Sequence, residues 1–256
     1  MNPPATGPQH VDIEALSATL DPQDPRGTVA RALALFPGET LISFSGAEDV
    51  ALIDMAAKSG SPYRVFTLDT GRLHPETLEF MELVRKRYQV GIEAAFPQPE
   101  AVLVLVREKG LFSFYADGHE ECCRIRKVEP LRRMLAGAGA YITGQRQDQS
   151  PATRAAIPLV QEDPGFSTDP ATPLIKFNPL AQWTSAQVWD YIREYDVPYN
   201  ALHDRGFQSI GCAPCTRATN PGEHERAGRW SWEEATQKEC GLHAMNVPGG
   251  GSKSVV

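Results

Sequence analysis

Several features of common protein classes are missing from this chain of 256 residues. Its start, MNPPATGPQH, has neither the basic beginning nor the apolar run of a signal peptide. The longest purely apolar run, AVLVLV at 101–106, is far too short to span a bilayer. The formal net charge of −7 argues against a protein that binds nucleic acid over its whole surface. We therefore expect a cytoplasmic protein with no membrane or nucleic-acid partner.

Two common nucleotide-binding motifs are also missing. No G-x-x-x-x-G-K-[ST] sequence occurs, which argues against a P-loop NTPase. No G-x-G-x-x-G follows the first apolar run that is typical of a strand, which argues against a nicotinamide dinucleotide site. Any nucleotide in this protein must be bound by a different loop.

The apolar segments that are present alternate between two kinds. An apolar fraction of 41% indicates a globular protein, and the length suits one large domain. Short β-branched runs predict strands, and segments with helical spacing of apolar residues predict helices. The predicted strands are 39–46, 63–70, 92–96 and 140–146, and the predicted helices are 11–20, 27–38, 47–60, 75–88, 101–109, 122–137 and 184–195. This alternation predicts an α/β fold with a mostly parallel sheet and helices on both faces.

The last part of the chain has a different composition. Near residue 216 the alternation stops, and the end of the chain, NVPGGGSKSVV, is rich in glycine. Such a composition is typical of a flexible segment. We predict an α/β domain over 1–215 and a flexible C-terminal segment over 216–256.

Two predicted strand ends carry residues suited to a ligand, because ligands of parallel sheets bind outside the carboxyl ends of the strands. SFSGAED at 43–49 offers hydroxyls and free N–H groups at a helix start, which together suit a phosphate. LDTGRLHPET at 68–77 places a carboxylate at the second strand end. Each segment is also explained by an ordinary turn with a capping side chain.

Cysteine is scarce, and its distribution is uneven. Five cysteines in a cytoplasmic chain argue for metal or redox chemistry rather than disulfides. Cys122 and Cys123 are adjacent, and Cys212 and Cys215 form a C-x-x-C in a turn. Four sulfurs suffice for a zinc site or an iron–sulfur cluster, and the spacing does not decide between them. Cys240 stands alone, in a polar stretch that suits either a reactive thiol or an incidental surface residue.

Six segments occur together in one order: SFSGAED, LDTGRLHPET, CCRIRKVEPL, TGQRQDQSPATR, GCAPCTR and ECGLH. In this combination the chain resembles the assimilatory sulfonucleotide reductases, and more narrowly the adenylyl-sulfate (APS) reductases that carry a [4Fe-4S] cluster. The resemblance covers about 39–243 and implies an adenine nucleotide α-hydrolase-like fold with a modified pyrophosphate loop at 43–49. Where that loop usually has a second glycine and Asp-Ser, this chain has Ala47 and Glu48-Asp49. The change favours a loop that binds a phosphosulfate rather than one that splits ATP.

The resemblance also implies a reaction in sulfate assimilation and cysteine biosynthesis. The Cys240 thiolate attacks the sulfur of APS, AMP leaves, and thioredoxin or a similar dithiol donor releases sulfite from the S-sulfonate on Cys240. His243 positions that cysteine, and Lys127 connects cluster and substrate. Substrate binding falls to Ser43, Ser45, Gly46, Glu48, Asp49, Asp69, Thr70, Gly71, Arg154, Arg226 and Arg229, with Arg146, Asp148 and Gln149 at the rim. The cluster ligands are Cys122, Cys123, Cys212 and Cys215.

Other functions fit parts of this pattern. A PAPS reductase would use the 3′-phosphorylated nucleotide, although the cluster cysteines favour APS. An ATP-using tRNA thiolase shares a similar loop, but no basic RNA-binding domain is evident. A zinc-stabilised binding module without catalysis would leave Cys240 unexplained. The sequence leaves the oligomeric state open, including a homo-oligomer.

Overall fold

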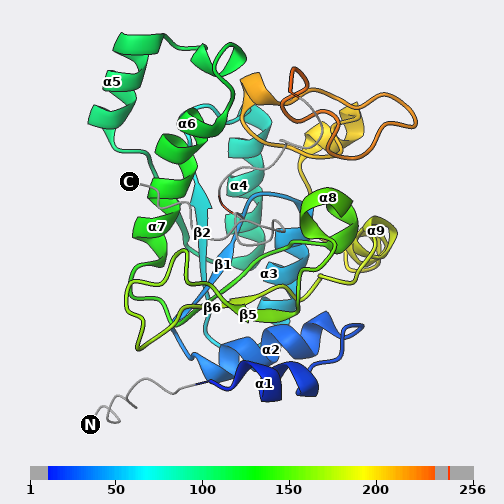
Figure 1. Cartoon of the computed structure of the whole chain (residues 1–256). Coiled ribbons are helices and arrows are strands. Elements are labelled where there is room, and N and C mark those ends of the chain that lie inside the picture. The colour runs from blue at the N-terminus through cyan, green and yellow to red at the C-terminus, as the bar shows by residue number, and fades with distance from the viewer. Residues whose placement is uncertain (1–10, 234–241, 243–256) are drawn as a thin grey trace.

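The structure, a computed structural model, describes residues 11–233 together with Leu242. Within these residues six strands form one sheet in the order β3-β2-β1-β4-β6-β5 (Figure 1). The strands are β1 (Thr40–Ser43), β2 (Arg64–Leu68), β3 (Ile92–Ala95), β4 (Ala140–Ile142), β5 (Val160–Glu162) and β6 (Ile175–Phe177). Every neighbouring pair is parallel except β5 with β6. The predicted mostly parallel α/β sheet is confirmed.

The helices alternate with the strands as the sequence pattern predicted. They are α1 (Ile13–Thr19), α2 (Pro25–Leu35), α3 (Ala47–Ser59), α4 (Pro75–Tyr88), α5 (Pro99–Lys109), α6 (Glu120–Cys123), α7 (Glu129–Leu135), α8 (Pro151–Arg154) and α9 (Ser185–Glu194). No helix in the described part of the chain combines the length and the apolar character needed to cross a bilayer.

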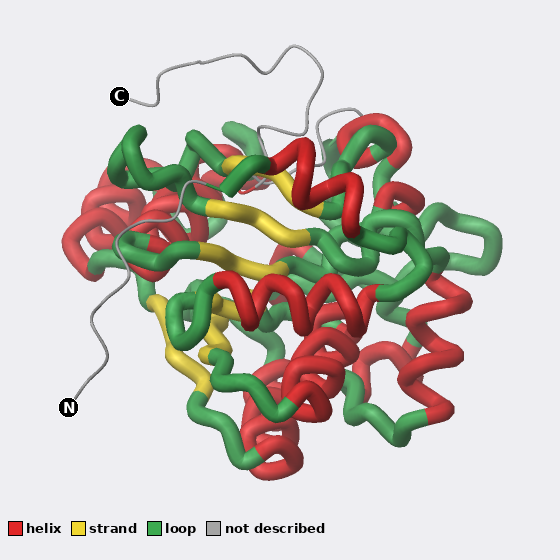
Figure 2. The backbone as a smooth tube through the Cα atoms, turned by 90° about the horizontal axis from the view of Figure 1, so that it is seen from below, coloured by secondary structure: helices red, strands yellow, loops and turns green. Residues whose placement is uncertain are grey.

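Alternate residues of the central strands bury opposite faces of the sheet, because successive side chains of a strand point to opposite sides. Ile42 and Val65 belong to the larger core, which α2, α3, α4 and α9 cover. Their neighbours Leu41 and Phe66 belong to a second core, which α7 covers. Figure 2 shows helices on both sides of the strands. Two covered faces leave the ends of the strands as the place for a site.

Two helix starts show how local chemistry sets an element's boundary. Thr184 caps α9, and its capping box with Gln187 is formed as predicted. By contrast, α2 begins earlier than the predicted residue 27. The Asp24 carboxylate accepts a hydrogen bond from the Gly27 N–H at 2.9 Å, and Pro25 occupies the first turn, where its missing N–H costs nothing.

The segment 122–137 is helical, but it is not one regular α-helix. A π-helix, η2 (Arg124–Val128), separates α6 from α7. In it the Glu129 N–H donates to the carbonyl of Arg124, five residues earlier. Pro130 has no N–H for an α-helical bond, so a wider turn just before it lets the helix continue. This irregular turn carries Lys127.

The last two strands of the sheet, β6 and the edge strand β5, were not predicted. Each has three residues, and an isolated run of three apolar or mixed residues has no period that distinguishes it from a loop. In the antiparallel pair that they form, Gln161 lies opposite Lys176.

Candidate active site

A cavity of about 210 Å³ lies beyond the carboxyl ends of β1, β2 and β4. Its wall includes the loop 43–49 after β1, Thr70 after β2, and 143–145 after β4. Parallel sheets place their ligands at this position, because the strand ends and the following helix starts converge there. Both predicted strand-end segments therefore contribute to one cavity.

The loop after β1 is held by the carboxylate of Asp49. One oxygen accepts from the N–H and the hydroxyl of Ser45, each at 2.8 Å, and from the Gly46 N–H at 3.2 Å. The other oxygen accepts from the Gly144 N–H at 2.9 Å, in the turn after β4. Burial raises the pKa of Asp49 to about 6, despite these donors. Asp49 thus binds protein atoms and shapes the loop, which starts α3.

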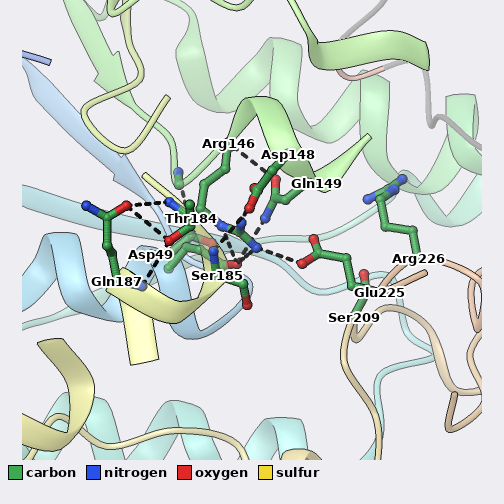
Figure 3. A network of polar contacts seen from close by, with 12 residues as sticks. Asp49, Arg146, Asp148, Gln149, Thr184, Ser185, Gln187, Ser209, Glu225 and Arg226 are labelled. Atoms are coloured by element: carbon green, nitrogen blue, oxygen red, sulfur yellow. Dashed lines mark hydrogen bonds and ion pairs between the residues drawn. The ribbon is translucent and has the colours of Figure 1, made fainter. Parts of the chain in front are cut away.

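A network of ion pairs and hydrogen bonds around Arg146 contacts the same loop at Glu48 (Figure 3). The Arg146 guanidinium is 1% exposed and pairs with Glu48 at 3.1 Å, with Glu225 at 2.8 Å and with Asp148. Gln149 donates a further hydrogen bond to Glu48 at 3.0 Å. Three carboxylates therefore neutralise Arg146, which is not among the residues that line the cavity.

Four cations line the cavity. Lys127 comes from η2, Arg154 from the short helix α8, and Arg226 and Arg229 from the segment after the C-x-x-C turn. Arg229 fits because Gly211 lies beneath it: a Cβ built on Gly211 would stand 2.5 Å from its guanidinium. Glu48, Asp49 and Glu225 line the cavity too, but Glu48 and Glu225 pair with Arg146 and Asp49 accepts from backbone N–H groups. The four cations from distant segments therefore suit an anionic ligand.

Of the three residues predicted to bind substrate at the turn after β2, one lines the cavity and two do not. Thr70 lines the cavity. The Asp69 carboxylate accepts from the Gly71 N–H at 2.8 Å and so closes its own turn. Gly71 has a φ of 70°, a conformation that favours glycine. Neither Asp69 nor Gly71 is among the residues that line the cavity.

The paired cysteines meet at a second, smaller cavity. All of Cys122, Cys123, Cys212 and Cys215 line it, together with Arg72, Phe114, His119, Arg126 and Lys127. Two of these residues, Lys127 and Cys212, line the larger cavity as well. The two cavities are therefore neighbours that share a cation and a thiol.

The end of β2 fixes the C-x-x-C turn beside both cavities. The Thr70 hydroxyl lies 3.2 Å from the Cys212 sulfur, and the Ala213 N–H donates to the Arg72 carbonyl at 2.8 Å. Arg126 donates to the Thr70 carbonyl at 2.6 Å. These contacts join the segment that follows the adjacent cysteines to the segment that holds the other pair.

The cysteine cavity has the chemistry of a thiolate site. Burial by itself raises the pKa of the Cys212 thiol, but Lys127, Thr70, Arg229 and Arg126 together bring that pKa below its ordinary value. Burial raises the pKa of Cys215 to about 12. No group of three or more His, Cys, Asp or Glu side chains among the described residues is arranged to hold a single metal ion. Four thiols without a carboxylate, next to cations, fit an anionic iron–sulfur cluster better than a carboxylate-bound ion.

Sequence reasoning missed the segment just before the C-x-x-C turn. His203 and the residues 208–211 line the larger cavity. Burial lowers the pKa of His203, which favours a neutral imidazole. Their position in the sequence could have revealed them. A polar segment directly before GCAPC must lie near the cavity if Cys212 does.

Cys240 and His243 lie outside the described residues. Leu242, which stands between them, lines the larger cavity and packs against both the second core and the cysteine cluster. Before this segment, Trp230 is fully buried, and Thr216 forms an isolated antiparallel bridge with Arg229. The division of the chain at 215/216 stays a prediction.

Comparisons with known proteins show the family of this chain. Residues 39–218 match the phosphoadenosine phosphosulfate reductase domain. An adenosine 5′-phosphosulfate reductase of Pseudomonas aeruginosa is 55% identical over 244 residues, which cover 95% of this chain and 91% of that protein. The crystal structure of a PAPS reductase from Candida auris, in a phosphate complex, has a TM-score of 0.66 and 28% identity and covers 82% of this chain and all of its own. Yeast FAD synthetase, with a TM-score of 0.52, 14% identity and coverage of 94% and 88%, shares the fold alone.

Proposed function

The chain belongs to the adenosine 5′-phosphosulfate reductases of the phosphoadenosine phosphosulfate reductase family, and from this membership we propose how its residues carry out the reaction. It is an oxidoreductase of sulfate assimilation that reduces APS. The observation that supports the proposal is one cavity lined by Lys127, Arg154, Arg226 and Arg229. Leu242, which follows Cys240 by two residues in the sequence, lines the same cavity.

The first step is a displacement at sulfur. The Cys240 thiolate forms a bond to the sulfate sulfur of APS, and the bond from that sulfur to the phosphate oxygen breaks. AMP leaves with the electron pair, and a thiosulfonate, Cys–S–SO₃⁻, remains on the protein. Since an anion attacks an anionic group, the four cations at the cavity lower the barrier only if they are in place beforehand.

Different parts of the cavity would bind different parts of the substrate. The N–H groups at the start of α3, with the Ser43 hydroxyl, suit the phosphate oxygens of AMP, whereas the N–H and hydroxyl of Ser45 are already donated to Asp49. Asp49 and Glu48 then act on the protein itself, by holding the loop and its support in one conformation. His243 would orient Cys240.

The second step takes two electrons from a dithiol donor such as thioredoxin. One thiolate of the donor attacks the Cys240 sulfur, sulfite leaves with the electron pair, and a mixed disulfide forms. The second donor thiol then breaks that disulfide and restores the Cys240 thiolate. Sulfur in the substrate is reduced, and the donor dithiol is oxidised to a disulfide.

Cys122, Cys123, Cys212 and Cys215 would hold a [4Fe-4S] cluster. The support is their common cavity, the absence of a carboxylate among the residues that line it, and the nearby Arg72, Arg126 and Lys127. When bound, the cluster would supply negative charge and rigidity beside the substrate, because the thiols of Cys240 and the donor already account for both electrons. Lys127, which lines both cavities, would balance the charge of both anions.

The proposal includes two predictions made from the sequence, the division of the chain near residue 216 and the location in the cytoplasm. Residues 1–215 would hold the cluster and most of the nucleotide site, and 216–256 would carry the reactive cysteine together with Arg226 and Arg229. The protein would work in the cytoplasm, where dithiol donors are kept reduced.

A test of the nucleophile uses Cys240→Ser. We expect this variant to bind AMP and retain iron like the unchanged protein, but to gain no SO₃ mass on mixing with APS in the absence of a dithiol. Peptide mapping of the unchanged protein should place the adduct on Cys240. An adduct on the variant, or on another cysteine of the unchanged protein, would refute the assignment.

A further inference from the structure

Glu233 is the last described residue before the stretch that leads to Cys240, and the side chain of Glu233 is bound to His119. One carboxylate oxygen of Glu233 accepts from the backbone N–H of His119 at 3.0 Å. The other lies 2.6 Å from the Nδ1 atom of His119, which therefore carries the proton that it donates. The two side chains are 1% and 8% exposed, so this pair is shielded from water.

Two tryptophans extend the contact. The fully buried ring of Trp230 stacks on the His119 ring, with centroids 4.0 Å apart and planes inclined by 23°. The Nε1–H of Trp232 donates to the Phe114 carbonyl at 3.1 Å, and its ring meets Tyr115 edge-on at 4.4 Å. Trp230, Trp232 and Glu233 on one side, with Phe114, Tyr115 and His119 on the other, form what we call the tail clamp.

The tail clamp is part of the wall that contains the cysteines. His119 and Phe114 line the cysteine cavity themselves. The Tyr115 hydroxyl donates to the carbonyl of Pro214, inside the C-x-x-C turn, at 2.8 Å. One side of the clamp is therefore fixed to the same rigid wall that shares Lys127 and Cys212 with the substrate cavity.

A fixed starting point matters because the remaining connection is short. Seven residues lead from Glu233 to Cys240, and even a fully extended chain of that length spans only about 25 Å. If the clamp opened, the thiol would sample a much larger volume, and its effective concentration at the substrate would fall. A buried carboxylate with both oxygens bonded is costly to release, which makes the attachment well defined.

We propose that the tail clamp is a positioning device for the reaction: Glu233 and Trp232 anchor the base of the segment that brings the Cys240 sulfur to the substrate. This inference rests on the proposed function, since it presupposes Cys240 as the nucleophile. It adds two positioning residues, neither of which lines the substrate cavity or the cysteine cavity. It also means that the wall of the cysteine cavity has a second task, which is to hold the reactive segment.

The experiment is a single turnover with APS in the absence of a dithiol, followed by the mass of the protein over time. For Glu233→Ala at saturating APS, we expect adduct formation on Cys240 to slow by about tenfold to a hundredfold, the usual cost of a misplaced reacting group. Iron content, AMP affinity and the alkylation rate of Cys240 without substrate should stay those of the unchanged protein. Trp232→Phe, which keeps a ring but loses the donor to Phe114, should show a smaller loss in the same direction.

The matched control is Glu223→Ala, in the same part of the chain. Glu223 accepts hydrogen bonds from Arg217 at 2.8 and 3.1 Å, but it lines neither cavity. This control should form the adduct at the normal rate. An unchanged rate in both clamp variants overturns the inference. So does a loss that only follows a parallel loss of iron or AMP binding, because that result describes a structural contact. If the unchanged protein forms no adduct on Cys240, the proposed function itself fails.

Discussion

Replacing Gly144 with alanine should separate the loop after β1 from the turn after β4. A Cβ atom built on Gly144 would stand 2.5 Å from the Glu48 Cβ, 2.7 Å from an Asp49 carboxylate oxygen and 3.0 Å from the Asp49 nitrogen. Carbon atoms in contact are normally about 3.5–4.0 Å apart, so the two segments must separate by roughly 1 Å. All three obstructing atoms belong to the start of α3, and two of them, the Glu48 Cβ and the Asp49 nitrogen, cannot swing away as the end of a flexible side chain does.

The size of the effect follows from that displacement. Overpacking of a well-packed region costs about 1–3 kcal/mol of unfolding free energy. The same shift weakens the hydrogen bond from the Gly144 N–H to Asp49 and moves the N–H groups that would face the phosphate. If about 1.4–2.8 kcal/mol of this cost falls on binding, the affinity for AMP decreases about tenfold to a hundredfold.

The assay is calorimetric titration of AMP, with urea unfolding of the same samples. Gly91→Ala is the matched control, because a Cβ there meets nothing within 4 Å and its φ is not positive. The control should bind AMP normally and be as stable as the unchanged protein or slightly more so. Normal AMP affinity in Gly144→Ala would refute the reasoning, since it would mean that the close approach of these segments does not position the phosphate loop.

Further expectations concern charge, metal, pH and substrate. Lys127→Ala should retain iron but lose about tenfold or more in the rate of adduct formation, because a buried charge-assisted contact is worth about 1.5–3 kcal/mol; an unchanged rate removes Lys127 from the mechanism. Iron and acid-labile sulfide should each be found at about four per chain, and stoichiometric zinc would contradict the cluster. The raised pKa of Asp49, about 6 against an ordinary 3.8, favours its protonated form in the fold, so its contribution is full below about pH 4 and is lost as the pH rises through 6. Urea unfolding between pH 4.5 and 7.5 should therefore show a stability difference between the unchanged protein and Asp49→Asn that shrinks with rising pH, whereas a constant difference would contradict it. The ratio of kcat/KM for APS to that for PAPS should favour APS, and a preference for PAPS would reassign the substrate.

The fold was predictable where local patterns are long. The runs that became β1 and β2, and the helices after them, show their period within a few residues of sequence. The break at η2 was not predicted, since the effect of Pro130 on the turn before it depends on which helical bonds the backbone can exchange. The pair β5 and β6 was missed because three residues carry no usable period.

The candidate site was predictable in its membership and less so in its arrangement. The four candidate cations at 127, 154, 226 and 229 do line one cavity. Arg146, a weaker candidate, is occupied by three carboxylates, and Asp69 closes its own turn. The sequence shows which residues are charged. It does not show which partners neutralise them, because partners such as Glu48 and Glu225 of Arg146 come from distant parts of the chain.

The sequence by itself determined the alternation of strands and helices, the supply of four clustered thiols and one separate thiol, and the absence of the common phosphate-binding loops. Each of these is a property of residues near one another along the chain. Only the tertiary structure decided that both cysteine pairs share one cavity, that Lys127 and Cys212 belong to two cavities, and that Glu233 is bound to His119 across 114 positions of sequence. The reason is physical: such contacts exist only after the sheet and its two covered cores bring distant segments together, and no local preference encodes them.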